Sequence, residues 1–269
     1  MYPVSIIFIT LFYISLLIFL VGMTRKIVQY WQTPVPLKIP TAPAPLTRSG
    51  VVLRMLREVI LFESLFKASK WTWLFGWLFH IGLALVLVRH LRYFWPGDLP
   101  EILLLTQPFK YAAFAFVIGL LGLLGRRIFV DRIRYISAPS DYLMLIILLI
   151  IGVSGVVMTF TDNHTDIIMV KEFASGLLIF DWVNLPTEVH FLVHIFLAFL
   201  ILAIFPISKL LHVPGVFFSP TRNQVDDSRK KRHISAWALQ QEQQNSVHLG
   251  EAIGTDGTLE TAAEPQTKG

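Results

Sequence analysis

The stretch WLFHIGLALVLVRH (residues 77–90) is apolar except for two histidines and one arginine. A second apolar stretch, HIFLAFLILAIFPISKLLH (residues 194–212), begins and ends with a histidine. Ionisable side chains inside a membrane are costly, so each is a candidate functional residue. These two stretches therefore indicate both the solvent in which the chain folds and the residues that carry its chemistry.

The composition of the whole chain agrees with a membrane protein. Of its 269 residues 54% are hydrophobic, and the mean hydropathy is +0.61, whereas a soluble domain of this size needs a more polar surface. The chain has no cysteine, which excludes a thiolate-ligated iron–sulfur cluster, a covalently attached c-type haem and a disulfide. Any redox centre must therefore be held by His or Met or by non-covalent packing.

Five segments are long and apolar enough to span about 30 Å of hydrocarbon. They are Ser5–Met23, Trp71–Tyr93, Phe109–Leu124, Asp141–Phe160 and Val189–Leu211. The first is not typical of a cleavable signal peptide, because it lacks a basic segment before it and is followed by Arg25 and Lys26. The fold class that we expect is an all-α integral membrane protein, a five-helix transmembrane bundle.

The distribution of Lys and Arg predicts the topology. Eight lie between the first and second spans, four between the third and fourth, and seven from Lys209 to the end. Few lie on the other side, where acidic residues are common. The positive-inside rule then places the N-terminus outside and the C-terminus in the cytoplasm. We therefore expect a multi-pass protein of the cell inner (cytoplasmic) membrane.

The chain divides into four regions along its length. They are a first transmembrane helix (1–23), a cytoplasmic Pro-rich segment with an amphipathic helix (24–70), a four-helix core (71–212) and a cytoplasmic basic segment with a tail (213–269). The amphipathic helix, Val51–Lys67, either lies on the membrane surface or docks a cytoplasmic subunit. The tail is polar and aperiodic, which predicts disorder. Its basic cluster, Arg229–Arg232, faces either a partner or anionic lipid.

The membrane histidines match in depth. The second span runs outward and the fifth runs inward, so His80 faces His212 near the cytoplasm and His90 faces His194 near the outer surface. Each level can hold one iron between two imidazoles. This arrangement predicts two haem b groups stacked across the membrane. The alternatives are histidines that only hydrogen-bond neighbouring helices, or a proton path in a transporter.

Helical spacing supports the pairing with one irregularity. His194 and His212 are 18 residues apart, roughly 27 Å and five turns, which places both on one face of a continuous helix. His80 and His90 are ten residues apart, so the second is rotated about 80° from the first. His190 lies one turn before His194 and is an alternative ligand. We favour His194 because of its spacing from His212.

The sequence resembles the respiratory nitrate reductase gamma subunit, a dihaem cytochrome b, in the two histidine-containing stretches. Over roughly residues 20–235 it is more similar to the DsrM family, the membrane cytochrome b subunits of the DsrMKJOP complex of dissimilatory sulfur metabolism. The segments that carry this likeness are PVPLKIPTAP (35–44), RMLREVILFESLF (54–66), RHLRYF (89–94), RYISAPSDY (134–142), VKEFASGLL (170–178) and GVFFSPTRN (215–223).

The resemblance implies two haem b groups with iron ligated axially by His80, His90, His194 and His212. It also implies an electron-transfer subunit of an oxidoreductase complex that exchanges electrons with quinol, of the menaquinol type. The expected partners are a DsrK-like cytoplasmic iron–sulfur subunit, a periplasmic multihaem cytochrome c, a periplasmic iron–sulfur protein and a second membrane subunit. Two other functions remain open: a gamma-type cytochrome b of a nitrate reductase-like complex, and a haem-free membrane anchor.

Overall fold

All regular structure in the described part of the chain is helical. The computed structural model describes residues 2–34, 40–95, 106–162, 165–219, 221–226 and 235–254. Residues 35–39 of the predicted Pro-rich segment and the basic cluster Arg229–Arg232 lie outside the described residues. The prediction of an all-helical chain is confirmed for the described ranges.

The α-helices vary widely in length. They are α1 (Pro3–Gln32), α2 (Arg48–Leu61), α3 (Glu63–Ala68), α4 (Lys70–His90), α6 (Ala112–Phe129), α7 (Asp131–Ile136), α8 (Pro139–Phe160), α9 (Ile167–Ile179), α10 (Val189–Ile204), α11 (His212–Gly215) and α12 (Ala236–Gly254). Short 3-10 turns extend or connect them: η1 (Leu91–Tyr93), η2 (Gln107–Tyr111), η3 (Phe205–Ile207), η4 (Lys209–Leu211) and η5 (Val216–Phe218).

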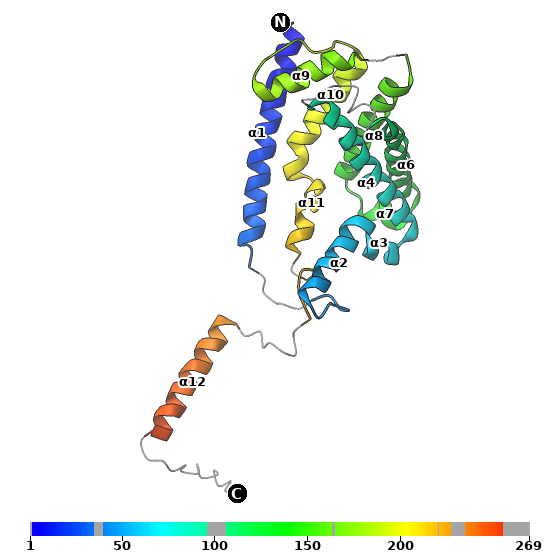
Figure 1. Cartoon of the computed structure of the whole chain (residues 1–269). Coiled ribbons are helices and arrows are strands. Elements are labelled where there is room, and N and C mark those ends of the chain that lie inside the picture. Colours follow the sequence, from blue (N-terminus) through cyan, green and yellow to red (C-terminus); the bar gives the residue numbers. More distant parts are fainter. Residues whose placement is uncertain are drawn as a thin grey trace. The chain divides into compact units, whose positions relative to one another are not determined.

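Five of the described helices are long and apolar enough to cross a membrane, which confirms the predicted number. With their adjoining 3-10 turns they cover Pro3–Gln32, Lys70–Tyr93, Gln107–Phe129, Pro139–Phe160 and Val189–Ile207. Figure 1 shows them as the long helices α1, α4, α6, α8 and α10. Much of their surface is exposed apolar side chain, which suits a lipid environment.

Chain contacts divide the protein into two units. The first consists of Met1–Pro34 with Val52–Ser219 and contains the five membrane-length helices. The second consists of Val35–Val51 with Pro220–Gly269. Within this second unit, the backbone N–H of Thr41 donates to the carbonyl of Thr221 at 2.9 Å.

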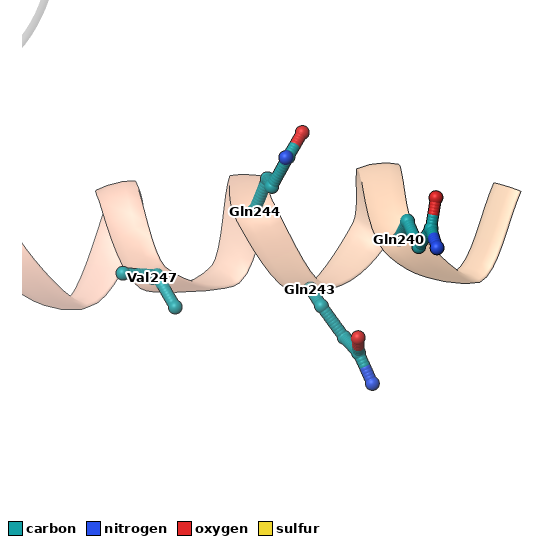
Figure 2. A pocket seen from close by; sticks show the side chains of 4 residues that line it. All are labelled: Gln240, Gln243, Gln244 and Val247. Carbon is teal, nitrogen blue, oxygen red and sulfur yellow. The ribbon is translucent and has the colours of Figure 1, made fainter. Parts of the chain in front are cut away.

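The helix α12 belongs to the second unit and differs from expectation, because the sequence predicts disorder in this tail. Ala, Leu, Gln and Glu, which are good helix formers, fill α12 even though its apolar residues show no period. The side chains of Gln240, Gln243, Gln244 and Val247 are exposed, and Figure 2 shows that they project in different directions from this one helix. They form no enclosed cavity.

The helices α4 and α6 make the most extensive helix–helix contact in the first unit. A Cβ on Gly82 would lie 2.5 Å from the backbone nitrogen of Phe116, and one on Gly119 would lie 2.6 Å from that of Phe79. The absence of side chains thus lets the two backbones touch, as small residues do in membrane helix pairs. Around this contact Phe79, Phe116 and Leu120 form a buried cluster.

A second apolar cluster closes one end of the first unit. The helix α9 crosses that end near the start of α1 (Figure 1). Its residues Val170, Phe173 and Leu177 pack with Phe8 of α1 and Phe191 of α10. The side chain of Asp166 caps α9 by accepting a hydrogen bond from the backbone N–H of Ile168 at 2.8 Å. The sequence interpretation did not predict this helix, which is too short to span a membrane.

Candidate functional site

The four predicted histidines come together in two pairs. The ring centres of His90 and His194 are 6.2 Å apart, and those of His80 and His212 are 5.9 Å apart. We call them the 90/194 pair and the 80/212 pair. His80 and His90 lie on α4, whereas His194 lies on α10 and His212 begins α11. The helix α4 thus supplies one ring to each pair, whereas α10 supplies a ring to the 90/194 pair only.

Three helices hold the 90/194 pair. The Nδ1 of His90 is 2.7 Å from the carbonyl oxygen of Val86, one turn back on α4. The Nδ1 of His194 is 3.1 Å from the carbonyl oxygen of Ile151 and 2.9 Å from Oγ of Ser154, both on α8. The two rings are nearly parallel, with an interplanar angle of 3°. Both rings are therefore fixed by contacts within continuous helices.

Ser154 is a residue that the sequence interpretation missed. It is buried in α8, and its Oγ donates to the carbonyl oxygen of Ile151 at 2.9 Å, which leaves its lone pairs for the N–H of His194. A hydroxyl between Gly152 and Gly155 in the middle of an apolar span is the signal that marks it.

The 80/212 pair is held differently. The Nδ1 of His80 is 2.6 Å from the carbonyl oxygen of Gly76, and that of His212 is 2.9 Å from the carbonyl oxygen of Lys209. The two rings are nearly perpendicular, at 84°. His212 is exposed and lies on a short helix of four residues. Its geometry is therefore not set by a long helix.

Phe62 is a second residue that the sequence interpretation missed. Its ring meets the edge of His80 at a centre-to-centre distance of 4.9 Å. The sequence predicts one helix over Val51–Lys67, but the structure divides it into α2 and α3 at Phe62, which has a φ of 50° and lies in the left-handed region. The division turns the aromatic ring towards α4.

The prediction that His194 and His212 share one face of a continuous helix was wrong. The helix α10 ends at Ile204, and two 3-10 turns around Ser208 follow before His212. Pro206 lies in the first of these turns, and proline cannot continue a helical hydrogen-bond ladder. The spacing argument therefore does not apply to this segment, although the two histidines still reach different partners on α4.

The hydrogen bonds of the four rings suit metal ligation. In each ring Nδ1 is bonded to a carbonyl oxygen, which fixes the proton on Nδ1 and leaves the Nε2 lone pair for a metal. Among the described residues these Nε2 atoms make no hydrogen bond. An imidazole nitrogen lies about 2 Å from its metal, so two imidazoles on opposite sides of one iron have ring centres about 6 Å apart. Both pairs meet this requirement.

Within the described ranges, three buried polar atoms near the 90/194 pair have no hydrogen-bond partner. They are Nη1 of Arg89, Nε of Arg92 and Nε2 of His190. Arg89 and Arg92 flank His90 in sequence, and His190 lies one turn before His194. Buried polar groups without partners are rare, and each calls for an explanation such as a bound group. Among the described residues, the ring of His190 packs against neither His90 nor His194.

Larger metal clusters are not formed by the described residues. No group of three or more His, Asp or Glu side chains converges there on one point. The two histidine pairs remain as candidate ligands, since each pair could hold one planar cofactor through its two imidazoles. A centre held in that way would transfer electrons.

Comparison with known proteins gives a consistent result. The sequence profile of the nitrate reductase gamma subunit family matches residues 63–225, which include all four paired histidines. The Hdr-like menaquinol oxidoreductase cytochrome b-like subunit of Archaeoglobus fulgidus is 38% identical over 270 aligned positions, covering 84% of this chain and 81% of that protein. The protein of the same description from Archaeoglobus profundus is 32% identical over 278 positions, covering 86% and 82%.

Proposed function

Because the chain belongs to the nitrate reductase gamma subunit family, we propose that it is a dihaem cytochrome b subunit that carries electrons between menaquinol and a cytoplasmic iron–sulfur subunit. The observation that carries this proposal is the geometry of the two histidine pairs. Their ring separations of 6.2 and 5.9 Å and their Nδ1 hydrogen bonds suit one iron in each pair.

The residues that would hold each haem follow from the contacts above. His90 and His194 would ligate one iron, and His80 and His212 the other. When bound, haem b supplies one-electron redox chemistry. The buried N–H groups of Arg89 and Arg92 would donate to the carboxylates of the haem at the 90/194 pair, because charge-assisted bonds to carboxylates are the strongest that a guanidinium makes.

The position of the quinol is a further part of the proposal. The charge distribution supports placing the 90/194 pair near the outer surface of the inner membrane and the 80/212 pair near the cytoplasm. The Nε2 of His190, which has no hydrogen-bond partner among the described residues, would lie at this outer level and could bond to a quinol hydroxyl. The exposed apolar face of α2, at the opposite level, is where a cytoplasmic subunit would dock.

The identity of the complex is supported by resemblance. The long segments similar to DsrM favour a complex of dissimilatory sulfur metabolism, with a DsrK-like subunit as the direct partner. The names of the two relatives describe a menaquinol oxidoreductase, which agrees with a quinol substrate. The family profile also supports the alternative, a gamma-type subunit of a nitrate reductase-like complex. The soluble subunits that copurify with the chain distinguish the two.

A haem assay on the purified full chain tests the proposal. We expect a pyridine haemochrome assay to give two haems b per chain. His194→Ala should reduce this to one, whereas His190→Ala should leave two. A preparation without haem would refute the proposed function, and loss of a haem in His190→Ala but not in His194→Ala would refute the ligand assignment.

The ring angles provide an independent signature of the two sites. The angle between two axial imidazole planes controls the anisotropy of the EPR signal of a low-spin ferric haem. Parallel rings at 3° and perpendicular rings at 84° should therefore give two separate signals, with the larger gmax from the 80/212 pair. His194→Ala should remove the signal with the smaller gmax. A menaquinol analogue should reduce both haems in isolated membranes.

A further inference from the structure

The segment that carries His212 cannot take its geometry from α10. The helix ends at Ile204, and two 3-10 turns, η3 and η4, lead to His212. Pro206 in this segment is fully buried, and a Cβ on Gly22 of α1 would lie 2.5 Å from its Cβ. The ring of Phe205 also packs against that of Phe19 at 5.6 Å. Contacts with α1 thus locate the start of this broken segment (residues 205–212), and the next ring contact with α1, between Tyr30 and Phe218 at 5.7 Å, follows His212 by six residues.

Lys209 connects the end of the broken segment to another helix. Its carbonyl oxygen accepts a hydrogen bond from Nδ1 of His212 at 2.9 Å. Its ammonium group donates to both carboxylate oxygens of Asp141, at 2.6 and 2.8 Å. One residue therefore orients the His212 ring through its backbone and binds α8 through its side chain.

Asp141 is built into the first turn of α8. Its side chain is only 6% exposed, although that of Lys209 is 73% exposed. One carboxylate oxygen accepts from the backbone N–H of Ala138 at 3.1 Å, as in a helix capping box, and a negative charge at this end of a helix is favourable. The carboxylate is therefore a fixed point, and the lysine is held to it.

Residues of α6, of α8 and of the loop before α8 reinforce this fixed point. Nη1 of Arg127 lies 3.4 Å from the Asp141 carboxylate and donates to Oγ of Ser137 at 2.7 Å. The hydroxyl of Tyr142 donates to the carbonyl oxygen of Arg127 at 3.0 Å. Three of these residues belong to the motif RYISAPSDY (134–142), for which the proposed function gives no role.

We propose that Asp141 is a positioning residue for His212. Asp141 acts through Lys209, which holds the imidazole of His212 against His80. This inference rests on the proposed function in taking His212 as an iron ligand. The 90/194 pair has no equivalent need, because His194 lies within α10 and bonds directly to α8. The effect of Asp141 should therefore be confined to one of the two haems.

Substitution of Asp141 in the full chain tests the inference. Asp141→Asn keeps the size of the side chain but removes the charge that binds Lys209. We expect the EPR signal with the larger gmax to shift or disappear and, where it disappears, the haem content to fall from two to one. The signal of the 90/194 pair should not move. Lys209→Met should give the same result, and the double variant should be no worse than either single variant.

A matched control is available ten residues away. Asp131 pairs with Arg134 at 2.6 Å, but both side chains are exposed, at 87% and 61%, and neither bonds to a histidine. Asp131→Asn should leave both haem signals unchanged. Lys209→Arg, which retains the charge, should preserve most of the wild-type signal. Equal disturbance of both haems by Asp141→Asn, or no change in either, would overturn the proposal.

Hydrogen exchange separates this proposal from the proposed function. If the wild-type chain contained no haem, the proposed function would fail. The backbone amides of residues 208–213 should still exchange faster in Asp141→Asn than in the wild type or in Asp131→Asn, because the segment has lost its anchor. Unchanged exchange in that segment would overturn the positioning role whether haem is present or not.

Discussion

The 90/194 pair and the 80/212 pair have nearly equal ring separations but are built in different ways. The two rings of the first pair lie within two continuous helices, and a third helix, α8, fixes the ring of His194 through Ser154 and Ile151. The second pair has one ring on a long helix and the other on a broken segment tied to α8 by an ion pair. The comparison shows that two equivalent cofactor sites can rest on helix continuity in one case and on tertiary anchoring in the other.

The largest effect should come from a substitution that disrupts both histidine pairs, however each pair is held. Gly119→Leu places a side chain where the backbone of Phe79 lies 2.6 Å away, so α6 must separate from α4, which carries both His80 and His90. The cost should exceed the about 1–3 kcal/mol typical of overpacking, because backbone cannot move aside as a side chain does. We expect loss of both haems, measured by the haemochrome assay.

Gly125→Leu is the matched control for this prediction. It makes the same change on the same helix, but among the described residues its Cβ would have only the ring of Phe129 within 4 Å, at 3.9 Å. Haem content should remain at two. A Gly119→Leu variant that retained both haems would show that the contact of α4 with α6 does not support either site.

A smaller effect, confined to the first pair, should follow from Ser154→Ala. The change removes one of two acceptors for the N–H of His194, and a hydrogen bond of this kind contributes about 0.5–1.5 kcal/mol. The carbonyl oxygen of Ile151 remains, so the haem should be retained. We expect a shift of the EPR signal with the smaller gmax and no change in the other signal. A shift in the larger-gmax signal alone would reverse the assignment of signals to pairs.

The smallest effect should come from the surface ion pair of Glu63 and Lys67, which lies outside both pairs. Lys67, at 2.6 Å, lowers the pKa of Glu63 below its usual value. Its contribution to stability is therefore present at neutral pH and is lost as pH falls through the lowered pKa. Because the side chain of Lys67 is 71% exposed and that of Glu63 is 33% exposed, water screens this pair, and Glu63→Gln should change the thermal unfolding midpoint only slightly at pH 7 and not at all at low pH. Neither EPR signal should change.

The sequence predicts the membrane-length helices well, because hydropathy reports burial in lipid directly. The expected span Asp141–Phe160 corresponds to Pro139–Phe160 in the structure, and Trp71–Tyr93 to Lys70–Tyr93. The first helix extends to Gln32, well past the predicted end at Met23. Arg25, Lys26, Gln29 and Gln32 are good helix formers, so the edge of the apolar segment is not the end of the helix.

The sequence gives less information about how the sites are held. Hydropathy treats Pro206 as one more apolar residue of a span, whereas its missing N–H ends the helix. The partnership of Asp141 with Lys209 joins residues 68 positions apart, which no local pattern reveals. The left-handed backbone at Phe62 is likewise set by packing against α4, because an aromatic residue has no intrinsic preference for it.

The end of α2 also limits how the length of the chain can vary. The indole N–H of Trp73 donates to the carbonyl oxygen of Leu61 at 2.7 Å, and that of Trp77 donates to the carbonyl oxygen of Ile60 at 3.1 Å. The two tryptophans are one helical turn apart on α4, so their indole N–H groups bond to two consecutive carbonyls in the last turn of α2. An insertion or deletion between Leu61 and Trp73 would break both bonds at once and leave two helix-end carbonyls unpaired. This interval should therefore keep a constant length among related chains.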